Sequence, residues 1–271
     1  MSLVALKQPE TGIFDGIPQK AYRRVDALYF SGLKHLDKSP AHFQEAILNP
    51  PEQTAAMRFG SAVHSAVLES GIAAGEVLSV DVSTRTTKAY KEFEAANPGK
   101  IILLQDEMDR VKAIVSALQS HPTVRALLQK GKAEQSVFWN DPETGVLCKC
   151  RPDYLRDDGI VIDLKTSSVG GASERGFQRA IMDYGYHWQS AWYLDGISQI
   201  MGKQLNQFVH IVVETEAPHA IGVFVLDDAS LERARVDIRR LVGVYTDCLH
   251  SGEWPGYSQE IQNISLPSWA W

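Results

Sequence analysis

The chain has 271 residues, of which 44% are hydrophobic and 22% charged, a composition typical of a globular protein that folds in water. Its net charge of −6 excludes a protein held to nucleic acid by overall charge, so any such surface must be a local concentration of Lys and Arg. No apolar run approaches the roughly 18 residues of a membrane span, and the amino terminus lacks a signal-peptide pattern. The three cysteines have no framework spacing, which fits a reducing compartment. We therefore expect a cytoplasmic protein without a membrane partner.

The first half of the chain is predicted to be mainly helical. Residues 54–70 carry apolar side chains at helical spacing, with small residues that permit close packing, and His64 lies among them. Residues 84–94 are polar and basic, so we expect a mobile or partly helical segment there. The other predicted helices of this half cover residues 31–36, 39–43, 106–118 and 123–128.

The second half alternates predicted strands with predicted helices. Short apolar runs lie between turn residues, and a long helical pattern with an aromatic stripe follows the third run. The predicted strands are residues 134–139, 146–153, 160–165, 207–214 and 221–226. The predicted helices are residues 174–200 and 229–249.

This order of elements predicts a mixed α/β fold with a helical amino-terminal portion. We expect a single domain over residues 1–271, because no internal repeat or low-complexity linker divides the chain. Its parts are a mainly helical portion (1–130), a catalytic core (131–252) and a tail (253–271). The tail holds three Trp residues, so we expect it to pack onto the body or onto a neighbour.

Two carboxylates and an amine are predicted to lie near one point. The third predicted strand ends in Asp163, Leu164 and Lys165, and because side chains alternate on a strand, Asp163 and Lys165 share one face. The turn at residues 156–159 folds this strand as a hairpin onto the strand that ends at Asp153. Close acids repel unless a cation lies between them, and carboxylate oxygens favour Mg²⁺ or Mn²⁺. The alternative is a surface hairpin with solvated side chains.

Three further features accompany these acids in chain order. Gly60 and His64 lie four residues apart on a predicted helix, and Glu134 opens the first of the predicted strands in the core. Gln189 and Tyr193 lie on the long helix, where a spacing of four residues places both on one face. Tyr193 also belongs to an aromatic stripe, and such stripes usually pack into a core.

Together these features resemble the RecB-like branch of the PD-(D/E)XK nuclease superfamily, in its Asp-x-Lys version. More closely the chain resembles the RecE-type exonucleases, in the catalytic domain of exonuclease VIII. The resemblance implies a PD-(D/E)XK-like core sheet flanked by helices. The closer match rests on Cys150-Arg151-Pro152-Asp153, Ile162-Asp163-Leu164-Lys165-Thr166 and the run from Asp183 to Tyr193, with residues 31–43 and 266–269 matching towards the two ends.

The resemblance also implies an activity and partners. The activity is Mg²⁺-dependent 5′→3′ digestion of linear double-stranded DNA, which leaves a 3′ single strand for recombination by strand annealing. The implied partners are a single-strand annealing protein of the RecT kind and further copies of the chain in a ring-shaped homo-oligomer. The implied setting is the cytoplasm of a bacterial or phage-infected cell.

The residue roles follow from the acids and from the resemblance. His64, Asp153, Asp163 and the backbone carbonyl of Leu164 are expected to hold one or two Mg²⁺ ions, for which Mn²⁺ can substitute. Lys165 is expected to position the attacking water and balance charge.

Three other residues complete the expected catalytic set. Gln189 and Tyr193 are expected to hold the scissile phosphate or the terminal nucleotide. Glu134 is expected either to ligate the cation, directly or through water, or to be a surface residue paired with Lys132 or Lys149.

Two other functions remain open from the sequence. One is an endonuclease or structure-specific nuclease of the same superfamily, and the other is a DNA-binding protein whose catalytic set has decayed. The intact Asp153, Asp163 and Lys165 argue against decay. Candidate phosphate contacts are Arg85, Lys88, Lys91, Arg175 and Arg179.

Overall fold

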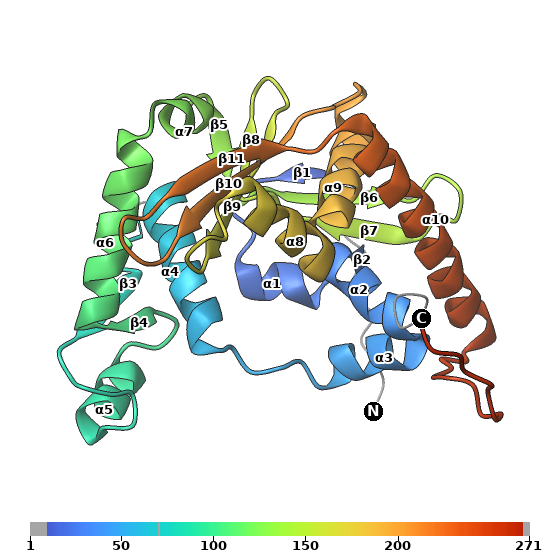
Figure 1. Cartoon of the computed structure of the whole chain (residues 1–271), viewed down its shortest axis with the longest axis horizontal. Helices are drawn as coiled ribbons and strands as arrows, with labels where there is room; N and C mark the ends of the chain where they lie inside the picture. The colour runs from blue at the N-terminus through green and yellow to red at the C-terminus, as the bar shows by residue number, and fades with distance from the viewer. Residues whose placement is uncertain (1–9, 70, 268–271) are drawn as a thin grey trace.

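The structure, a computed structural model, describes residues 10–69 and 71–267. Its central element is a five-stranded sheet in the order β11-β10-β9-β8-β5, in which β9 and β10 are parallel and the other pairs antiparallel (Figure 1). A parallel pair needs a crossover, and two helices provide it here. The strands are β5 (Gly131–Ala133), β8 (Tyr154–Arg156), β9 (Val161–Ser167), β10 (Phe208–Glu214) and β11 (Ile221–Val225).

A second sheet of four strands lies beside the first, in the order β1-β6-β7-β2. Every residue of β7 is buried, as are the first four of β6, so this sheet is an interior layer. A separate pair, β3 with β4, is parallel. The strands are β1 (Gly12–Phe14), β2 (Leu28–Tyr29), β3 (Val77–Val80), β4 (Ile101–Leu104), β6 (Ser136–Asn140) and β7 (Leu147–Cys150).

The chain passes from one sheet to the other between β7 and β8. We expected one strand over residues 146–153 that pairs directly with the strand of Asp163, and this prediction is wrong. β7 ends at Cys150 and pairs with β6 and β2, whereas β8 is the strand that forms the hairpin with β9. Pro152 accounts for the break, because proline has no N–H to donate to a ladder.

Helices cover both sides of the sheets (Figure 1). α4 and α6 pack on the side of Ile162 and Leu164, whereas α9 and α10 share a core cluster with β6 and β7. These four helices each bury apolar side chains against the sheets. The helices are α1 (Gln19–Arg24), α2 (Phe30–Lys38), α3 (Pro40–Leu48), α4 (Ala55–Leu68), α5 (Lys88–Ala96), α6 (Gln105–Ser120), α7 (Pro122–Leu127), α8 (Glu174–Tyr184), α9 (Tyr186–Met201) and α10 (Asp228–Ser251).

The long helix predicted over residues 174–200 is two helices in the structure. α8 ends and α9 begins at Gly185, whose φ of 69° is left-handed. Glycine adopts this conformation without the steric cost that a Cβ imposes. The break lets α9 take its own direction across the sheet, which places Gln189 beside Asp163 of β9.

The mixed α/β fold class with a helical amino-terminal portion is confirmed. The expected packing of the tail holds only at its start, where Trp254 stacks on Phe43 with ring centroids 5.5 Å apart. Tyr257 lies against His42, with ring centroids 5.5 Å apart, whereas Ile261 and Ile264 are 95–100% exposed. Trp269 and Trp271 lie outside the described residues, and packing of the tail onto a neighbour stays a prediction. Each helix in residues 10–69 and 71–267 is too short or too polar to span a lipid bilayer.

Candidate metal-dependent active site

Asp163 and Lys165 lie on one face of β9, as strand alternation predicts. Asp163 is only 2% exposed, and Lys165 Nζ lies 2.9 Å from its Oδ1 and 2.7 Å from its Oδ2. The ammonium also faces the ring of Tyr186 at 4.7 Å from the centroid. Burial disfavours the charged amine, but the carboxylates of Asp163 and Asp153 outweigh it and raise the pKa of Lys165. The pair is therefore charged and partly desolvated.

Asp153 is held beside β9 by a hydrogen bond to the backbone. β8 pairs Tyr154 with Ile162, and continuing this antiparallel register would pair Pro152 with Leu164. Instead, Asp153 Oδ2 accepts the N–H of Leu164 at 2.7 Å. The N–H and C=O of a strand residue point to the same side, so the Leu164 carbonyl also faces this edge. The crossing between the sheets thus places Asp153 next to the Asp-x-Lys strand.

His64 and Glu134 join Asp153 in a compact group, in which one ligand atom of each residue lies within 4.8 Å of the others. His64 Nδ1 lies 3.5 Å from Asp153 Oδ2. Glu134 adopts a left-handed φ of 52°, and its N–H donates to the Asp153 carbonyl at 3.1 Å. No other group of three His, Cys, Asp or Glu residues in the described chain is this compact. α4 and the β5–β6 connection therefore bring two further ligands to Asp153.

The charges of this group are poorly balanced without a cation. Burial, with the carboxylates of Asp153 and Glu69, raises the pKa of Glu134 to about 7. Burial favours neutral His64, but the carboxylate of Asp153 outweighs it and raises the pKa of His64 to about 9. A divalent cation would relieve the repulsion between the acids and take the place of the proton on His64.

Glu134 is neither a free surface residue nor a partner of the lysines considered for it. Lys132 forms its ion pair with Asp15, and Lys149 donates to backbone carbonyls. The cation nearest to Glu134 is Arg151, at 3.9 Å, and Arg151 also donates to the hydroxyl of Ser136. Arg151 therefore belongs to the support of the site, on the crossing between the two sheets.

Gln189 and Tyr193 occupy one side of α9, facing the same region. Gln189 Nε2 donates to Asp163 Oδ1 at 2.6 Å, and Gln189 is 5% exposed. The ring of Tyr193 packs edge-on against Phe208, with centroids 5.8 Å apart. Gln189 thus contacts a proposed metal ligand rather than pointing at open solvent, and its role towards a phosphate stays a prediction.

Sequence reasoning missed His210, which lies at the centre of β10. It is fully buried and stands opposite Asp163 in the parallel register, with Nδ1 3.5 Å from Asp163 Oδ2. Its Nε2 lies 3.0 Å from the hydroxyl of Ser190, beside Gln189 on α9. The available signal was a single histidine within the otherwise apolar strand Phe208–Val213.

The donor set fits a hard divalent cation with mixed oxygen and imidazole ligands. Asp153, Glu134 and His64 supply the compact group, and the Leu164 carbonyl faces the same edge. Asp163 lies outside that group, because its oxygens contact Lys165 and Gln189, yet its buried Oδ2 has no well-formed hydrogen bond. Oδ2 forms an ion pair with Lys165 at 2.7 Å but accepts no well-formed hydrogen bond, so it keeps a lone pair that a metal ion could take.

In this sheet the Asp-x-Lys motif lies on one strand of a parallel pair, beside a second Asp. This is the arrangement of the PD-(D/E)XK nuclease superfamily, and the fold and the sequence assign the protein to that superfamily. Within it, the chain belongs to the family described as a PDDEXK-like domain of unknown function (DUF3799), which matches residues 30–267. Superfamily membership, expected from the sequence motifs, is thereby confirmed. The narrower RecE-type assignment stays a prediction.

Comparison with solved structures agrees with this fold. A protein from Eubacterium rectale, described as a "putative exonuclease", superposes with a TM-score of 0.58 at 15% identity, over 92% of this chain and 93% of that chain. Identity this low shows a shared fold alone. A second structure, SSO0001, aligns over 84% of this chain and 87% of its own at 13% identity, with a TM-score of 0.29 that supports no argument. A comparison with curated proteins found no match.

Proposed function

We propose that this protein is a Mg²⁺-dependent exodeoxyribonuclease that digests linear double-stranded DNA in the 5′→3′ direction and leaves 3′ single strands. The observation that carries the proposal is the compact group of His64, Glu134 and Asp153 beside the Asp163–Lys165 pair. Membership of the PDDEXK-like family supports phosphodiester hydrolysis. Direction and substrate rest on the resemblance to RecE-type exonucleases.

Each residue has a role in this chemistry. Asp153, Glu134, His64 and Asp163 would hold one or two cations, and a bound cation would polarise the scissile phosphate and lower the pKa of a bound water. Lys165, already charged, would orient the attacking water and balance negative charge on the phosphate.

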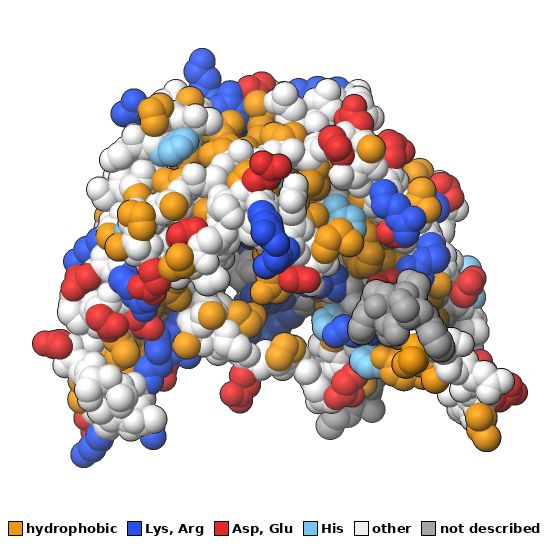
Figure 2. Space-filling view, viewed as in Figure 1, with side chains coloured by type: hydrophobic (Ala, Val, Ile, Leu, Met, Phe, Trp, Pro, Cys, Tyr) orange, Lys and Arg blue, Asp and Glu red, His pale blue; other side chains and the backbone are white. Residues whose placement is uncertain are grey.

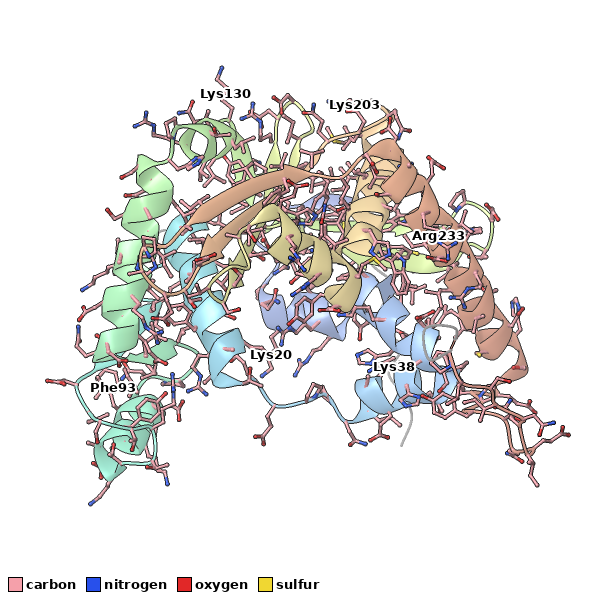
Figure 3. All side chains as sticks on the ribbon, viewed as in Figure 1. Lys20, Lys38, Phe93, Lys130, Lys203 and Arg233 are labelled. Carbon is pink, nitrogen blue, oxygen red and sulfur yellow. The ribbon has the colours of Figure 1, made fainter. Side chains whose placement is uncertain are left out.

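Basic side chains near Lys165 support a DNA substrate. Lys34 and Lys38 lie on α2, and Lys34 lies near the site, since the charge of Lys165 is one of the causes, after burial and Lys38, that lower the pKa of Lys34. Figure 2 shows this face hollowed at its lower centre, with Lys and Arg side chains in the hollow. Lys20 on α1 and Lys38 on α2 lie on the same lower side, whereas Lys130 and Lys203 lie at the upper edge (Figure 3). Backbone phosphates would meet these lower cations.

One of the phosphate contacts considered from the sequence has another partner. Arg85 donates to both carboxylate oxygens of Glu107, at 2.7 and 2.5 Å. One guanidinium nitrogen thus contacts both carboxylate oxygens in a charge-assisted pair, so Arg85 is engaged within the fold. The cations of α1 and α2 are better placed for a duplex.

The proposal includes partners that the resemblance implies. A ring of identical subunits would surround the duplex and keep the enzyme on one strand end between cleavage events. An annealing protein of the RecT kind would take up the 3′ single strand as it appears. Sedimentation analysis of the purified chain tests the ring, and co-purification with a RecT-type protein tests the second partner.

The deciding experiment uses linear duplexes labelled at either the 5′ or the 3′ end, together with a covalently closed circle, each incubated with Mg²⁺ and with EDTA. We expect mononucleotide release from the 5′ label at once, gradual shortening of the 3′-labelled duplex and an intact circle. Cleavage of the circle would indicate an endonuclease instead. Absence of cleavage on all substrates, with either Mg²⁺ or Mn²⁺, would overturn the nuclease function.

A further inference from the structure

A buried line of three polar side chains runs from β9 through β10 to α9. Asp163, His210 and Ser190 are 2%, 0% and 0% exposed. His210 Nδ1 lies 3.5 Å from Asp163 Oδ2, and His210 Nε2 lies 3.0 Å from Ser190 Oγ. The rings of Phe208 and Phe177 enclose the imidazole, with centroids 4.8 and 5.1 Å away. Polar groups in such an apolar enclosure are costly unless they pair with each other.

Which ring nitrogen of His210 carries a proton determines the hydrogen bonds among these three side chains. A carboxylate oxygen only accepts hydrogen bonds, and a neutral imidazole carries a single N–H. If Nε2 carries it, Nδ1 presents a lone pair to the carboxylate of Asp163 and stays unpaired. If Nδ1 carries it, the ring donates to Asp163, and the Ser190 hydroxyl donates to Nε2.

The arrangement with the proton on Nδ1 of His210 satisfies more hydrogen-bonding groups. The Ser190 hydroxyl also lies 3.0 Å from the carbonyl of Tyr186, one turn earlier in α9. That carbonyl is the regular helical acceptor for the Ser190 N–H, so it loses little when the hydroxyl turns to His210. A buried nitrogen lone pair that faces a carboxylate oxygen costs more than one surplus helix bond is worth. The Nδ1–H tautomer follows.

We propose that His210, oriented by Ser190, is a positioning residue that holds the Asp163 carboxylate in the plane needed to ligate the cation. Lys165 and Gln189 hold Oδ1 through flexible side chains, whereas His210 is fixed within a central strand of the sheet. The three contacts leave the remaining lone pairs of Asp163 to the cation. This inference rests on the proposed function, since it assigns Asp163 to the same metal site.

The size of the effect follows from other metal sites. Groups that hydrogen-bond a metal ligand typically contribute 10- to 100-fold to metal affinity or activity. Two substitutions distinguish the roles of the two ring nitrogens of His210. Asn places its amide N–H near the position of Nδ1, and Gln places its amide N–H near the position of Nε2. A merely space-filling histidine would not distinguish them, because neither variant fills the ring volume.

The experiment measures Mn²⁺ affinity by titration calorimetry on the full chain, with thermal unfolding in EDTA as the folding control. We expect His210→Asn to bind Mn²⁺ close to wild type and His210→Gln and His210→Phe to bind 10- to 100-fold more weakly. Cleavage assays should show a matching rise in the Mn²⁺ concentration needed for half-maximal rate. Equal affinity in all variants, with the wild type binding Mn²⁺, overturns the inference and leaves the proposed function standing. A wild type that binds no cation overturns both.

A measurement on the wild-type protein covers the case in which a variant does not fold. Nitrogen-15 spectra of labelled histidine distinguish the Nδ1–H from the Nε2–H tautomer, and the buried ring is recognised by slow exchange of its proton with solvent. We expect Nδ1–H for this ring, and Ser190→Ala should weaken that preference. The Nε2–H tautomer in the wild type would overturn the inference.

Discussion

Asp153 accepts the backbone N–H of Leu164 at 2.7 Å, so a proposed metal ligand also closes the open edge of β9. One carboxylate therefore sets the spacing between the ligand group and the Asp-x-Lys strand. If β8 extended to Pro152, that residue would lie opposite Leu164, but proline has no N–H for the ladder. The hydrogen bond from Leu164 to the Asp153 side chain replaces the missing strand pairing. The Asp153 carboxylate therefore has two roles, since it bonds the backbone of β9 and is also a proposed metal ligand.

Replacing Asp153 with Asn separates these two roles. The amide oxygen of Asn can still accept the Leu164 N–H, so we expect thermal stability in EDTA close to wild type. Loss of the charged ligand should weaken Mg²⁺ or Mn²⁺ binding by at least ~10-fold and abolish cleavage, which calorimetry and the labelled-duplex assay measure. Asp157→Asn, on the exposed β8–β9 turn, is the matched control and should bind cations normally. Unchanged affinity in the Asp153 variant would remove it from the ligand set.

Replacing Lys165 with Ala tests the role of the ammonium. A positioned group that assists proton transfer or stabilises charge contributes ~10²- to 10⁴-fold, so we expect the cleavage rate at saturating cation to fall by that factor. The fold should persist, because Gln189 and His210 remain beside Asp163. Lys165→Arg keeps the charge and is the control for its loss. Full activity in the Ala variant would exclude Lys165 from the mechanism.

Charge reversal at Lys20 and Lys38 tests the proposed path of the duplex. If these side chains contact phosphates, the double change to Glu should weaken DNA binding and reduce the slope of log K against log salt by about two. Fluorescence anisotropy with a labelled duplex, in Ca²⁺ to prevent cleavage, measures both. Lys130→Glu, at the opposite edge of the molecule, serves as control and should leave the slope unchanged. An equal effect from the control would point to overall charge.

Lys149 gives the protein a specific pH dependence of stability. The side chain is 4% exposed and donates to the carbonyls of Tyr22, Arg23 and Val25. Burial lowers the pKa of Lys149 from 10.5 to about 8, so the unfolded chain binds more protons between these two values. The contribution of Lys149 to the free energy of unfolding should therefore increase as the pH rises from 8 to 10.5, by about 1–3 kcal/mol.

Urea unfolding of wild type and of Lys149→Met at pH 7.5, 9 and 10.5 isolates that contribution. The difference between the two proteins cancels the other groups that titrate in this range. We expect the stability of wild type relative to the variant to rise with pH. A difference that stays constant or shrinks would show that Lys149 is charged throughout.

The sequence predicted the local geometry of β9 better than the path of the chain through the fold. Alternation on β9 correctly placed Asp163 and Lys165 on one face, because a period of two is independent of the neighbouring strands. The partner of that strand was wrongly predicted, since Pro152 ends a ladder without saying which sheet the chain enters next. Asp153 still lies beside β9, but it belongs to the segment that joins β7 of one sheet to β8 of the other.

Two other differences have physical reasons of the same kind. A glycine inside a helical pattern is compatible with a continuous helix, so the break at Gly185 depends on its left-handed φ, which composition does not reveal. His210 lies in an apolar strand with no local motif, and its relation to Asp163 exists only through the parallel register of β9 and β10. The contact between His210 and Asp163 therefore depends on long-range strand pairing rather than on local propensity.

The proposed ligands come from α4, the β5–β6 connection and the crossing before β8, which are separated by up to 89 positions along the chain. A partly synthesised or partly unfolded chain cannot gather them, so under the proposed function such a chain would not cleave DNA. The proposed cleavage activity would appear only when the tertiary structure has formed.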